Sequence, residues 1–305
     1  MTTQSPRPLR MRSWLFAPGD SEKKMGKAIA SEADIALLDL EDSVTPDNKP
    51  AARAAVAQAI GEAEDRSRVW VRINPLSSGW TEADLDAVIP AGPGGVFLPK
   101  AEGGHDVETL DAMLNAREKA AGIAAGSTKV AALVTETAAA MFTTGTYDCA
   151  QKGQERLVAM SWGAEDLSSE LGAREQRGAD GEYTHVYEMA RSLCLIGAVK
   201  AGVAPIETVQ PEFRDLEALA QRARSVRAQG FRGMLAIHPA QVEPINTAFT
   251  PSAEEIAHAR AIIQAFADNP GAGTVALDGN MLDRPHLALA QKLLDEGLLG
   301  EAGQE

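Results

Sequence analysis

The chain has 305 residues, of which 45% are apolar, so it can bury a substantial core in one large domain or two smaller ones. Its formal net charge of −14 argues against a nucleic-acid binder, because phosphate neutralisation needs clustered Lys and Arg and the basic residues form no run. No stretch approaches the ~18 uninterrupted apolar residues of a membrane span, and residues 1–14 lack the apolar region typical of a secretory signal, so we expect a cytoplasmic protein.

Short apolar runs alternate along the chain with stretches rich in Ala, Glu, Lys, Arg and Leu, which favour helices. A count of about eight runs in this length predicts an α/β fold, a (β/α)8 TIM barrel, rather than an open doubly wound sheet. Neither a Gly-x-Gly-x-x-Gly fingerprint nor a Walker-type phosphate loop supports the open sheet. The predicted strands lie at 14–17, 35–40, 69–73, 95–98, 130–134, 157–161, 203–207 and 234–237. Helices are predicted between them, among others at 51–63, 107–121, 137–150, 190–201 and 216–229.

The pattern changes after the eighth run. Ser252 is a candidate N-cap for a helix over 254–267, an Asn-Pro-Gly break follows, and a last amphipathic helix is predicted at about 285–299. We therefore predict a barrel domain over residues 1–248 and a C-terminal helical extension over 249–305. The extension exceeds what a barrel needs, so it could close the bottom, cover the mouth or reach into a neighbouring subunit.

In a parallel barrel the chemistry gathers at the carboxyl ends of the strands, so the residues after each apolar run carry the functional signal. The stretch SWGAEDLS at 161–168 is a clear case, because two adjacent carboxylates follow a predicted strand. Any one such residue could cap a helix or solvate a loop, but their coincidence at one end of the barrel indicates a site. The polar residues in these positions are Asp39, Glu41, Asp42, Arg72, Asn74, Lys100, Glu136, Glu165, Asp166 and His238.

Carboxylates that converge on one mouth repel each other unless they are protonated or paired with cations. Without clustered His or Cys, the cation that suits such oxygen ligands is Mg²⁺ or Mn²⁺. Glu136 and Asp166 are the candidate ligands, and they leave positions for water and a chelating substrate. Arg72 and Arg12 could bring planar donors to a substrate oxygen beside the metal. A small 2-keto acid fits such a site, since the metal would polarise its carbonyl for aldol or Claisen chemistry.

Several motifs, in order along the chain, resemble one known family. They are RSWLFAPGD at 12–20, LLDLEDSV at 37–44, VRIN at 71–74, LPK at 98–100, TETA at 135–138, GAEDL at 163–167, AIHPAQV at 236–242 and DGNMLDRPH at 278–286. Through them the chain resembles the citrate lyase β-subunit-like group of the HpcH/HpaI aldolase superfamily, which includes malyl-CoA and citramalyl-CoA lyases. The resemblance runs nearly end to end, and several ordered motifs are far more specific than any one.

The resemblance implies a (β/α)8 barrel with a C-terminal extension, assembled as a homo-oligomer, a trimer or hexamer, with a Mg²⁺ site. It implies that Glu136 and Asp166 are the metal ligands and that Arg72 contacts the keto acid and the developing enolate oxygen. The other residues that match positions lining the site, ordering it or lying at its rim are Arg12, Glu41, Asp42 and Lys100.

The resemblance also gives the extension a role. Asp283 matches the acid/base aspartate that the family's extension delivers to the active site of an adjacent subunit. Asp278 could be confused with it, but the MLD segment aligns better with the family's motif. Taken from the residues alone, Asp283 could equally be a helix N-cap just before Pro285.

These features predict a Mg²⁺-dependent carbon–carbon lyase that cleaves or forms a β-hydroxyacyl-CoA thioester, of the malyl-CoA or citramalyl-CoA type, with an acyl-CoA and a 2-keto acid as the other reactants. One alternative is the citryl-cleaving β subunit of a citrate lyase complex. Another is a non-catalytic relative that binds acyl-CoA or a keto acid. A class I aldolase is disfavoured, because Lys100 would need a desolvated pocket to act as a nucleophile and acids surround it.

The remaining reactive residue types favour structural roles. His238 stands in a His-Pro turn and is expected to order nearby backbone. Cys149 and Cys194 lack the spacing of a metal site or disulfide framework and are expected to be bystanders. Trp162 and Glu207 depart from residues frequent in the family, which leaves open which acyl chain and keto acid fit.

Overall fold

The computed structural model describes residues 9–148, 155–179 and 181–301. Its internal contacts divide the chain into two compact units, of which one comprises Met11–Asn246 and the other contains the chain from Thr247 onward. The division lies two residues before the predicted boundary between 248 and 249. The two units are described separately below.

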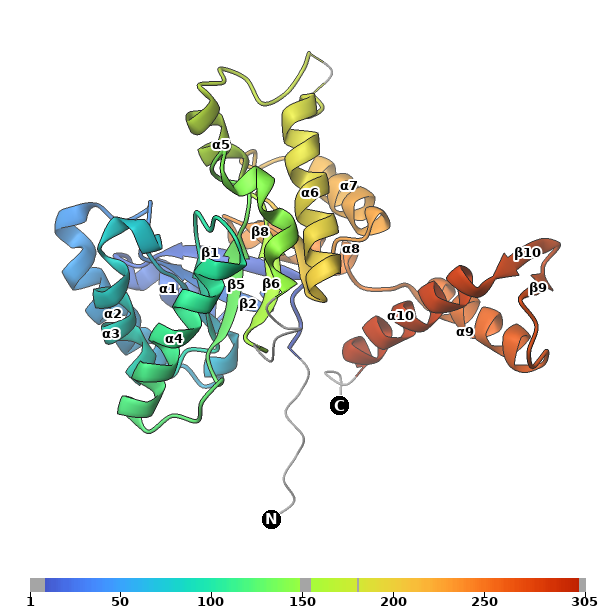
Figure 1. The fold of residues 1–305 in the computed structure, drawn as a ribbon, viewed down its shortest axis with the longest axis horizontal. Helices are drawn as coiled ribbons and strands as arrows, with labels where there is room; N and C mark the ends of the chain where they lie inside the picture. The colour runs from blue at the N-terminus through green and yellow to red at the C-terminus, as the bar shows by residue number, and fades with distance from the viewer. Residues whose placement is uncertain (1–8, 149–154, 180, 302–305) are drawn as a thin grey trace. The chain divides into compact units, whose positions relative to one another are not determined.

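Eight parallel strands close the first unit into a barrel (Figure 1). Each strand pairs with the next along the chain, and β1 closes the barrel by pairing with β8, so that Ser13 lies opposite Met234. The strands are short and mostly buried, because helices cover them outside and side chains fill the interior. They are β1 (Ser13–Pro18), β2 (Ile35–Asp39), β3 (Val69–Arg72), β4 (Gly95–Leu98), β5 (Lys129–Leu133), β6 (Leu157–Ser161), β7 (Ala204–Glu207) and β8 (Gly233–Ala236). The predicted (β/α)8 barrel is confirmed.

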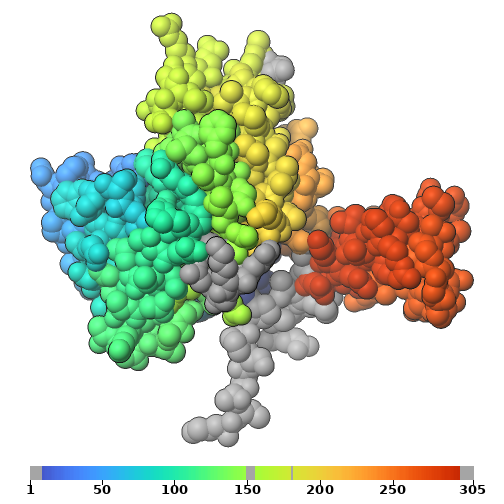
Figure 2. All heavy atoms as spheres, in the orientation of Figure 1, coloured from blue at the N-terminus to red at the C-terminus, as the bar shows by residue number. Residues whose placement is uncertain are grey.

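Helices cover the outside of the barrel. The helix α2 shows why they dock, because it buries Ala52, Val56 and Ile60, which share one face at a spacing of four residues. The helices α2, α3 and α4 pack against one another in order on one flank, and Figure 2 shows this flank as a continuous surface that runs from blue to green. The helices of this unit are α1 (Glu22–Ile29), α2 (Lys49–Glu62), α3 (Thr81–Val88), α4 (Gly104–Ala121), α5 (Ala164–Leu171), α6 (His185–Ala201) and α7 (Leu216–Gln229). The helix α8 (Val242–Ala248) begins in this unit and ends two residues after the division.

The helix predicted at 137–150 is wrong within the described residues. The chain there forms two short 3-10 segments, Ala140–Phe142 and Thr144–Thr146. The hydroxyl of Thr143 donates to the Ala140 carbonyl and that of Thr146 donates to the Thr143 carbonyl, so these side chains offer the backbone an alternative to the helix. Residues 149 and 150 lie outside the described part of the chain.

The second unit has a core of its own. Its elements are α9 (Ala253–Ala267), β9 (Thr274–Leu277), β10 (Asn280–Asp283) and α10 (Arg284–Glu301), drawn in orange to red in Figures 1 and 2. The helix α9 begins at the predicted cap, where Ser252 and Glu255 form a reciprocal capping box. The buried core residues are Ala259, Ile262, Phe266, Val275, Leu282 and Ala290. Among the described helices of the chain, none has the length and apolar character that crossing a bilayer requires.

The hairpin of β9 and β10 is not among the elements predicted from the sequence. The two strands are antiparallel and join through Asp278 and Gly279, whose φ angles are 49° and 80°. Two consecutive left-handed residues form the turn that matches the twist of a hairpin, and Asp-Gly is its usual sequence. Asp278 therefore has a structural role in the turn.

Candidate active site

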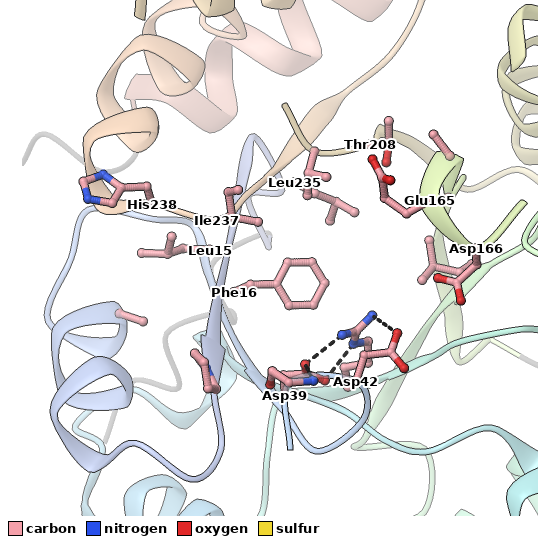
Figure 3. A pocket seen from close by; sticks show the side chains of 18 of the residues that line it. Leu15, Phe16, Asp39, Asp42, Glu165, Asp166, Thr208, Leu235, Ile237 and His238 are labelled. Carbon is pink, nitrogen blue, oxygen red and sulfur yellow. Dashed lines mark hydrogen bonds and ion pairs between the residues drawn. The ribbon is translucent and has the colours of Figure 1, made fainter. Parts of the chain in front are cut away.

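A cavity of about 620 Å³ opens at the carboxyl ends of the barrel strands (Figure 3). Residues that end a strand or directly follow one form much of its wall, among them Asp39, Arg72, Trp162, Thr208 and Ile237. The cavity thus lies at the end of the barrel where the sequence places the site.

Arg72 is the centre of a charge network on the cavity wall. Its Nε and Nη2 each donate a 2.7 Å hydrogen bond to Asp39, and its Nη1 lies 2.9 Å from Oε2 of Glu41. Burial favours a raised pKa for Asp39, but Arg72 and the hydrogen bonds from Ser43 and Glu41 outweigh it and hold the pKa below its ordinary value. Arg72 lies over the ring of Phe16, 4.8 Å from its centroid. The guanidinium is therefore fixed as well as charged.

Lys100 connects three acidic side chains. It follows β4 with a φ of 50°, in the left-handed region that a non-glycine residue seldom adopts. Its backbone N–H donates to Oε2 of Glu136 at 2.5 Å, while Nζ lies 2.5 Å from Oε1 of Glu41 and 3.1 Å from Oδ1 of Asp166. Burial would lower the pKa of Lys100, but these acids outweigh it and raise the pKa, so the amine stays protonated. A protonated amine is no nucleophile, which argues against the class I aldolase alternative.

Glu136 and Asp166 form the candidate metal pair. Burial raises the pKa of Glu136 to about 8, with further contributions from the negative charges of Asp166 and Glu41. Burial also raises the pKa of Glu41, although Arg72 and Lys100 oppose it. The site therefore favours an added proton or cation, and carboxylate oxygens are ligands that Mg²⁺ prefers.

No group of three or more His, Cys, Asp or Glu residues in the described chain is arranged to hold a metal by itself. A pair of carboxylates nevertheless fits Mg²⁺, which commonly keeps several water ligands and binds one or two protein carboxylates together with substrate. Glu136 and Asp166 would supply those two carboxylates.

Gly163 makes room for Glu136. A Cβ atom on Gly163 would lie 2.8 Å from Cγ of Glu136, closer than such atoms approach in proteins, and in a tight contact of 3.1 Å with its Oε1. Because Gly163 has no side chain, Glu136 can lie against the start of α5. Asp166 then stands in the first turn of α5, and its side chain is 29% exposed at the cavity.

Two further acids lie at the cavity. Asp42 is exposed, and its Oδ2 is 4.0 Å from Nη1 of Arg72 and 3.8 Å from Nζ of Lys100. Glu165 lines the cavity but accepts a 2.8 Å hydrogen bond from the side chain of Gln176. The structure therefore brings together six of the predicted site residues, namely Glu41, Asp42, Arg72, Lys100, Glu136 and Asp166.

Arg12 is not among them, and the expectation that it binds substrate is corrected. Arg12 precedes β1 and so lies at the amino ends of the strands, the end of the barrel opposite the cavity. There its Nη2 and Nε bind Asp34, which precedes β2, at 2.8 and 2.9 Å. Sequence proximity to a strand was misleading, because a residue before a strand and one after it lie at opposite ends of a parallel barrel.

Lys49 supports the loop beside the site, a role that the sequence did not reveal. Its buried Nζ donates to the carbonyl oxygens of Leu40 and Glu41 at 2.8 and 3.0 Å, and to Oδ1 of Asn74 at 2.8 Å. These bonds fix the loop that carries Glu41. Sequence patterns cannot disclose such a role, since the bonds join separate strands and a helix.

The structural roles expected for two other residues are confirmed. The Nδ1 atom of His238 accepts a hydrogen bond from the backbone N–H of Ala240, and its ring stacks on Phe213 with centroids 4.8 Å apart. In Figure 3 the imidazole points away from Asp166. Cys194 is buried, and burial raises the pKa of its thiol, as expected of a bystander. Cys149 lies outside the described residues.

Asp283 belongs to the second unit, where it ends β10. Its Oδ1 lies 2.5 Å from Nδ1 of His286 in the first turn of α10. The two side chains are 46% and 48% exposed, so the carboxylate is accessible at the surface of its unit.

A closed (β/α)8 barrel with a charged cavity at the carboxyl ends of its strands is the architecture of TIM-barrel enzymes. The family model described as HpcH/HpaI aldolase/citrate lyase matches residues 12–239, and the chain belongs to this family.

Named relatives match along most of the chain. A citrate lyase subunit beta-like protein from Mycobacterium tuberculosis is 36% identical over 294 residues, which cover 96% of this chain and 97% of the relative. The mitochondrial citramalyl-CoA lyase of Rattus norvegicus is 30% identical over 291 residues, which cover 93% and 85%. The crystal structure of the CitE protein from M. tuberculosis in complex with magnesium, acetoacetate and coenzyme A matches with a TM-score of 0.75 and 33% identity, over 94% of this chain and 98% of that one.

Proposed function

We propose that this protein is a Mg²⁺-dependent carbon–carbon lyase that cleaves a β-hydroxyacyl-CoA thioester to an acyl-CoA and a 2-keto acid, or forms it in the reverse direction. The observation that carries the proposal is the buried Glu136, whose pKa is raised beside Asp166 at a cavity of about 620 Å³. Two adjacent carboxylates favour a divalent cation there. The magnesium, acetoacetate and coenzyme A bound to the M. tuberculosis relative support the same reading. We expect the reaction to take place in the cytoplasm.

In this proposal Glu136 and Asp166 hold the ion. Bound Mg²⁺ would supply a Lewis acid that polarises the keto carbonyl. Arg72, fixed by its two bonds to Asp39, stabilises negative charge as it moves between the keto-acid oxygen and the thioester enolate. Lys100 holds Glu136 through its backbone N–H and Asp166 through its ammonium group, and so keeps both ligands in place.

The lyase also needs an acid/base. Cleavage returns a proton to the α-carbon of the enolate, and condensation removes it. We assign this proton transfer to Asp283, the role that the family resemblance implies for it. The acids of the cavity are engaged by Arg72, Lys100 or Gln176 or are assigned to the metal, which leaves this role open to a residue from outside the cavity. We further propose that the C-terminal extension delivers Asp283 to the cavity of an adjacent subunit, so that the protein acts as a homo-oligomer, a trimer or hexamer.

The margin of the cavity suits a CoA thioester. Lys24 and Lys27 lie one turn apart on α1, are exposed and line the cavity edge. Within the described residues no carboxylate forms an ion pair with either of them. In a chain with a net charge of −14, these two cations are suited to the phosphate groups of a nucleotide-bearing substrate.

A complementation assay tests the assignment of Asp283. Glu136→Gln and Asp283→Asn are each expected to abolish cleavage of malyl-CoA or citramalyl-CoA, while Asp283→Asn keeps its Mg²⁺ and keto-acid binding. If the base comes from a neighbour, hybrid oligomers produced by co-expression contain cavities with both groups intact and recover part of the activity. Hybrids without activity would place the two residues in the same subunit's site, and an active Asp283→Asn variant would remove Asp283 from the mechanism.

The name of the M. tuberculosis relative favours one second candidate, the citryl-cleaving β subunit of a citrate lyase complex. That function needs partner proteins and a thioester on an acyl carrier protein. The purified chain alone would then be inactive on acyl-CoA substrates, and activity on citrate would appear only with co-purified partners. A relative that only binds its ligand would respond to Mg²⁺ and keto acid in a thermal-shift assay but turn over neither class of thioester.

A further inference from the structure

We infer that Tyr187 is a positioning residue of the metal site, because it fixes the helix α5 through Ser168 and so holds Asp166 at the place where the cation binds. Tyr187 lies on α6 and is 1% exposed. The inference rests on the proposed function, since it concerns the ligand that Asp166 supplies there. It gives the buried tyrosine a role that neither the sequence motifs nor the lining of the cavity indicates.

The helix α5, which carries Asp166 in its first turn, is short and has a small buried face. It comprises eight residues, of which Ala164 and Leu167 are the buried ones. A helix of this length is not stable by itself in water. Its position, and with it the position of Asp166, therefore depends on the side-chain bonds that tie it to the rest of the barrel.

One such bond joins Ser168 of α5 to Tyr187 of α6. The two hydroxyl oxygens lie 2.7 Å apart. The Ser168 hydroxyl donates to the carbonyl oxygen of Ala164 at 2.9 Å, so its single proton is used there. The Tyr187 hydroxyl is therefore the donor to Ser168, and within the described residues it has no other hydrogen-bond partner.

This bond holds α5 from the side opposite the cavity. Successive residues of an α-helix are turned by about 100°, so Asp166 and Ser168, two residues apart, point to nearly opposite sides of α5. On one side Asp166 lines the cavity and lies 3.1 Å from Nζ of Lys100 (Figure 3). On the other side Tyr187 holds the helix. Without that bond α5 can turn about its own axis, and such a turn displaces the carboxylate of Asp166.

The start of α5 is fixed by a second bond. The buried Trp162 stands two residues before the helix, and its Nε1 donates a 2.9 Å hydrogen bond to Oε1 of Glu207 at the end of β7. Arg222 binds the same oxygen at 2.7 Å, so this carboxylate has its own counter-charge. Trp162 and Glu207, the two residues that depart from those frequent in the family, are thus partners of each other. Because the start of the helix is held there, the Tyr187 bond decides its remaining orientation.

The ring of Tyr183 packs between these two bonds. Its centroid is 5.1 Å from that of Trp162 and 6.1 Å from that of Tyr187. Its hydroxyl lies 3.4 Å from Nη2 of Arg222 and forms no bond to α5 in the described part of the chain. Tyr183 therefore supplies a matched control, since it is a buried tyrosine of the same cluster whose hydroxyl does not touch the helix that carries the ligand.

Titration calorimetry of the whole protein with Mg²⁺ tests the inference without requiring turnover. Tyr187→Phe removes one hydroxyl and keeps the ring, and it should weaken Mg²⁺ binding at least about tenfold, as loss of a group that orients a metal ligand does. Tyr183→Phe should leave Mg²⁺ binding unchanged. A Tyr187→Phe protein that unfolds at lower urea concentration but binds Mg²⁺ as tightly as the unsubstituted protein would show a purely structural hydroxyl and overturn the inference.

Turnover at different Mg²⁺ concentrations separates positioning of the ligand from a part in the chemical step. The activity that Tyr187→Phe loses at low Mg²⁺ should return at saturating Mg²⁺, since mass action offsets a weakened site. A kcat that stays low at saturating Mg²⁺ would assign Tyr187 to the chemical step and contradict the positioning role.

Two further variants test the route through Ser168 and the ligand itself. Ser168→Ala should weaken Mg²⁺ binding as Tyr187→Phe does, and the double variant should bind no more weakly than either single one, because both changes remove the same bond. Effects that multiply would mean that Tyr187 acts by another route, and the inference would fail. If Asp166→Asn left Mg²⁺ binding unchanged, the proposed metal site would fall and the inference with it. If Asp166→Asn abolished binding while Tyr187→Phe did not weaken it, the inference alone would fall.

Discussion

Two buried glutamates in the same barrel have pKa values that are shifted in opposite directions. Glu118 on α4 receives N–H bonds from Thr128 and Gly126 and two bonds from the guanidinium of Arg156, all between 2.7 and 2.9 Å. Burial would raise its pKa, but Arg156 and the backbone bonds outweigh it and lower the pKa to about 2. Glu136 is also buried, yet the neighbouring acids Asp166 and Glu41 add to the effect of burial and its pKa rises to about 8.

The two glutamates, whose pKa values shift in opposite directions, lie at opposite ends of the barrel. Thr128 and Arg156 directly precede β5 and β6, so the Glu118 cluster lies at the amino ends, where barrels place residues for stability. Glu136 follows β5 at the carboxyl end, where barrels place chemistry. Burial alone therefore does not mark a functional carboxylate in this protein. What marks it is burial beside other acids, whose repulsion a proton or a bound cation offsets.

The largest expected effect is on turnover at the carboxyl end. Glu136→Gln removes a proposed metal ligand and should abolish Mg²⁺-dependent cleavage of the acyl-CoA substrate. The same change removes a carboxylate whose ionisation is unfavourable in the fold, so the metal-free protein should unfold at equal or higher urea concentration. Steady-state kinetics and urea unfolding in EDTA measure the two effects. A large loss of stability would mean that Glu136 supports the fold as Glu118 does.

A substitution at the amino end, in the Glu118 cluster, should change stability and leave catalysis intact. Arg156→Met leaves Glu118 buried without its cation and should lower the free energy of unfolding by about 3–5 kcal/mol. Arg117→Met is the matched control on α4, because Arg117 pairs with the exposed Glu82 and Asp86, and its loss should cost less than about 1 kcal/mol. Urea unfolding measures both. If the folded fraction of Arg156→Met had a lower kcat/KM, the separation of the two ends would fail.

A smaller effect is expected from the glycine beside Glu136. Gly163→Ala would set a Cβ against the carboxylate and displace it, so the affinity for Mg²⁺ should fall about 10- to 100-fold, as for other changes that move a metal ligand. Gly61→Ala in α2 meets no atom within 4 Å and should leave Mg²⁺ affinity unchanged. Calorimetric titration with Mg²⁺ distinguishes the two. Equal affinities in both variants would count against Glu136 as a ligand.

The last effect, the smallest for any single step of one pH unit, is the pH dependence of stability, which should have opposite signs for the two glutamates. Between its ordinary value of 4.5 and about 8, Glu136 holds a proton in the metal-free fold that the unfolded chain has released, so stability falls as pH rises through this window. Glu118 is ionised in the fold above about pH 2, so its contribution is present above pH 4.5 and is lost as pH falls toward 2.

Urea unfolding across pH in EDTA measures these slopes, each at most about 1.4 kcal/mol per pH unit for one proton. Glu136→Gln should flatten the upper window alone, and Glu118→Gln the lower one alone. In the unsubstituted protein, Mg²⁺ binding below pH 8 should release the proton of Glu136, which calorimetry in buffers of different ionisation enthalpy detects. An unchanged upper slope in Glu136→Gln would assign the shift to another group.

Most of the barrel could be predicted from local patterns. The alternation of apolar runs and helix-forming stretches predicted eight strands and the end of the barrel that holds the site, and all eight strands formed. The errors were also local. Asp278-Gly279 is a hairpin signal, although no hairpin is predicted there, and the helix predicted after β5 does not form because Thr hydroxyls compete for the backbone bonds. Arg12 is predicted in the site because its guanidinium could bind a substrate oxygen and because the family resemblance matches it to a lining position. It precedes β1, however, and so lies at the opposite end of the barrel.

The sequence by itself determined the architecture and the residue types at the strand ends, because burial period and helix propensity are properties of neighbouring residues. Only the tertiary structure decided which of those acids are neutralised. The Asp39–Arg72 and Glu41–Lys100 pairs join residues 33 and 59 positions apart, and the crowding of Glu136 by Asp166 arises where separate strands meet. The ionisation of a carboxyl depends on charges within a few ångströms in space, and closure of the barrel sets those distances.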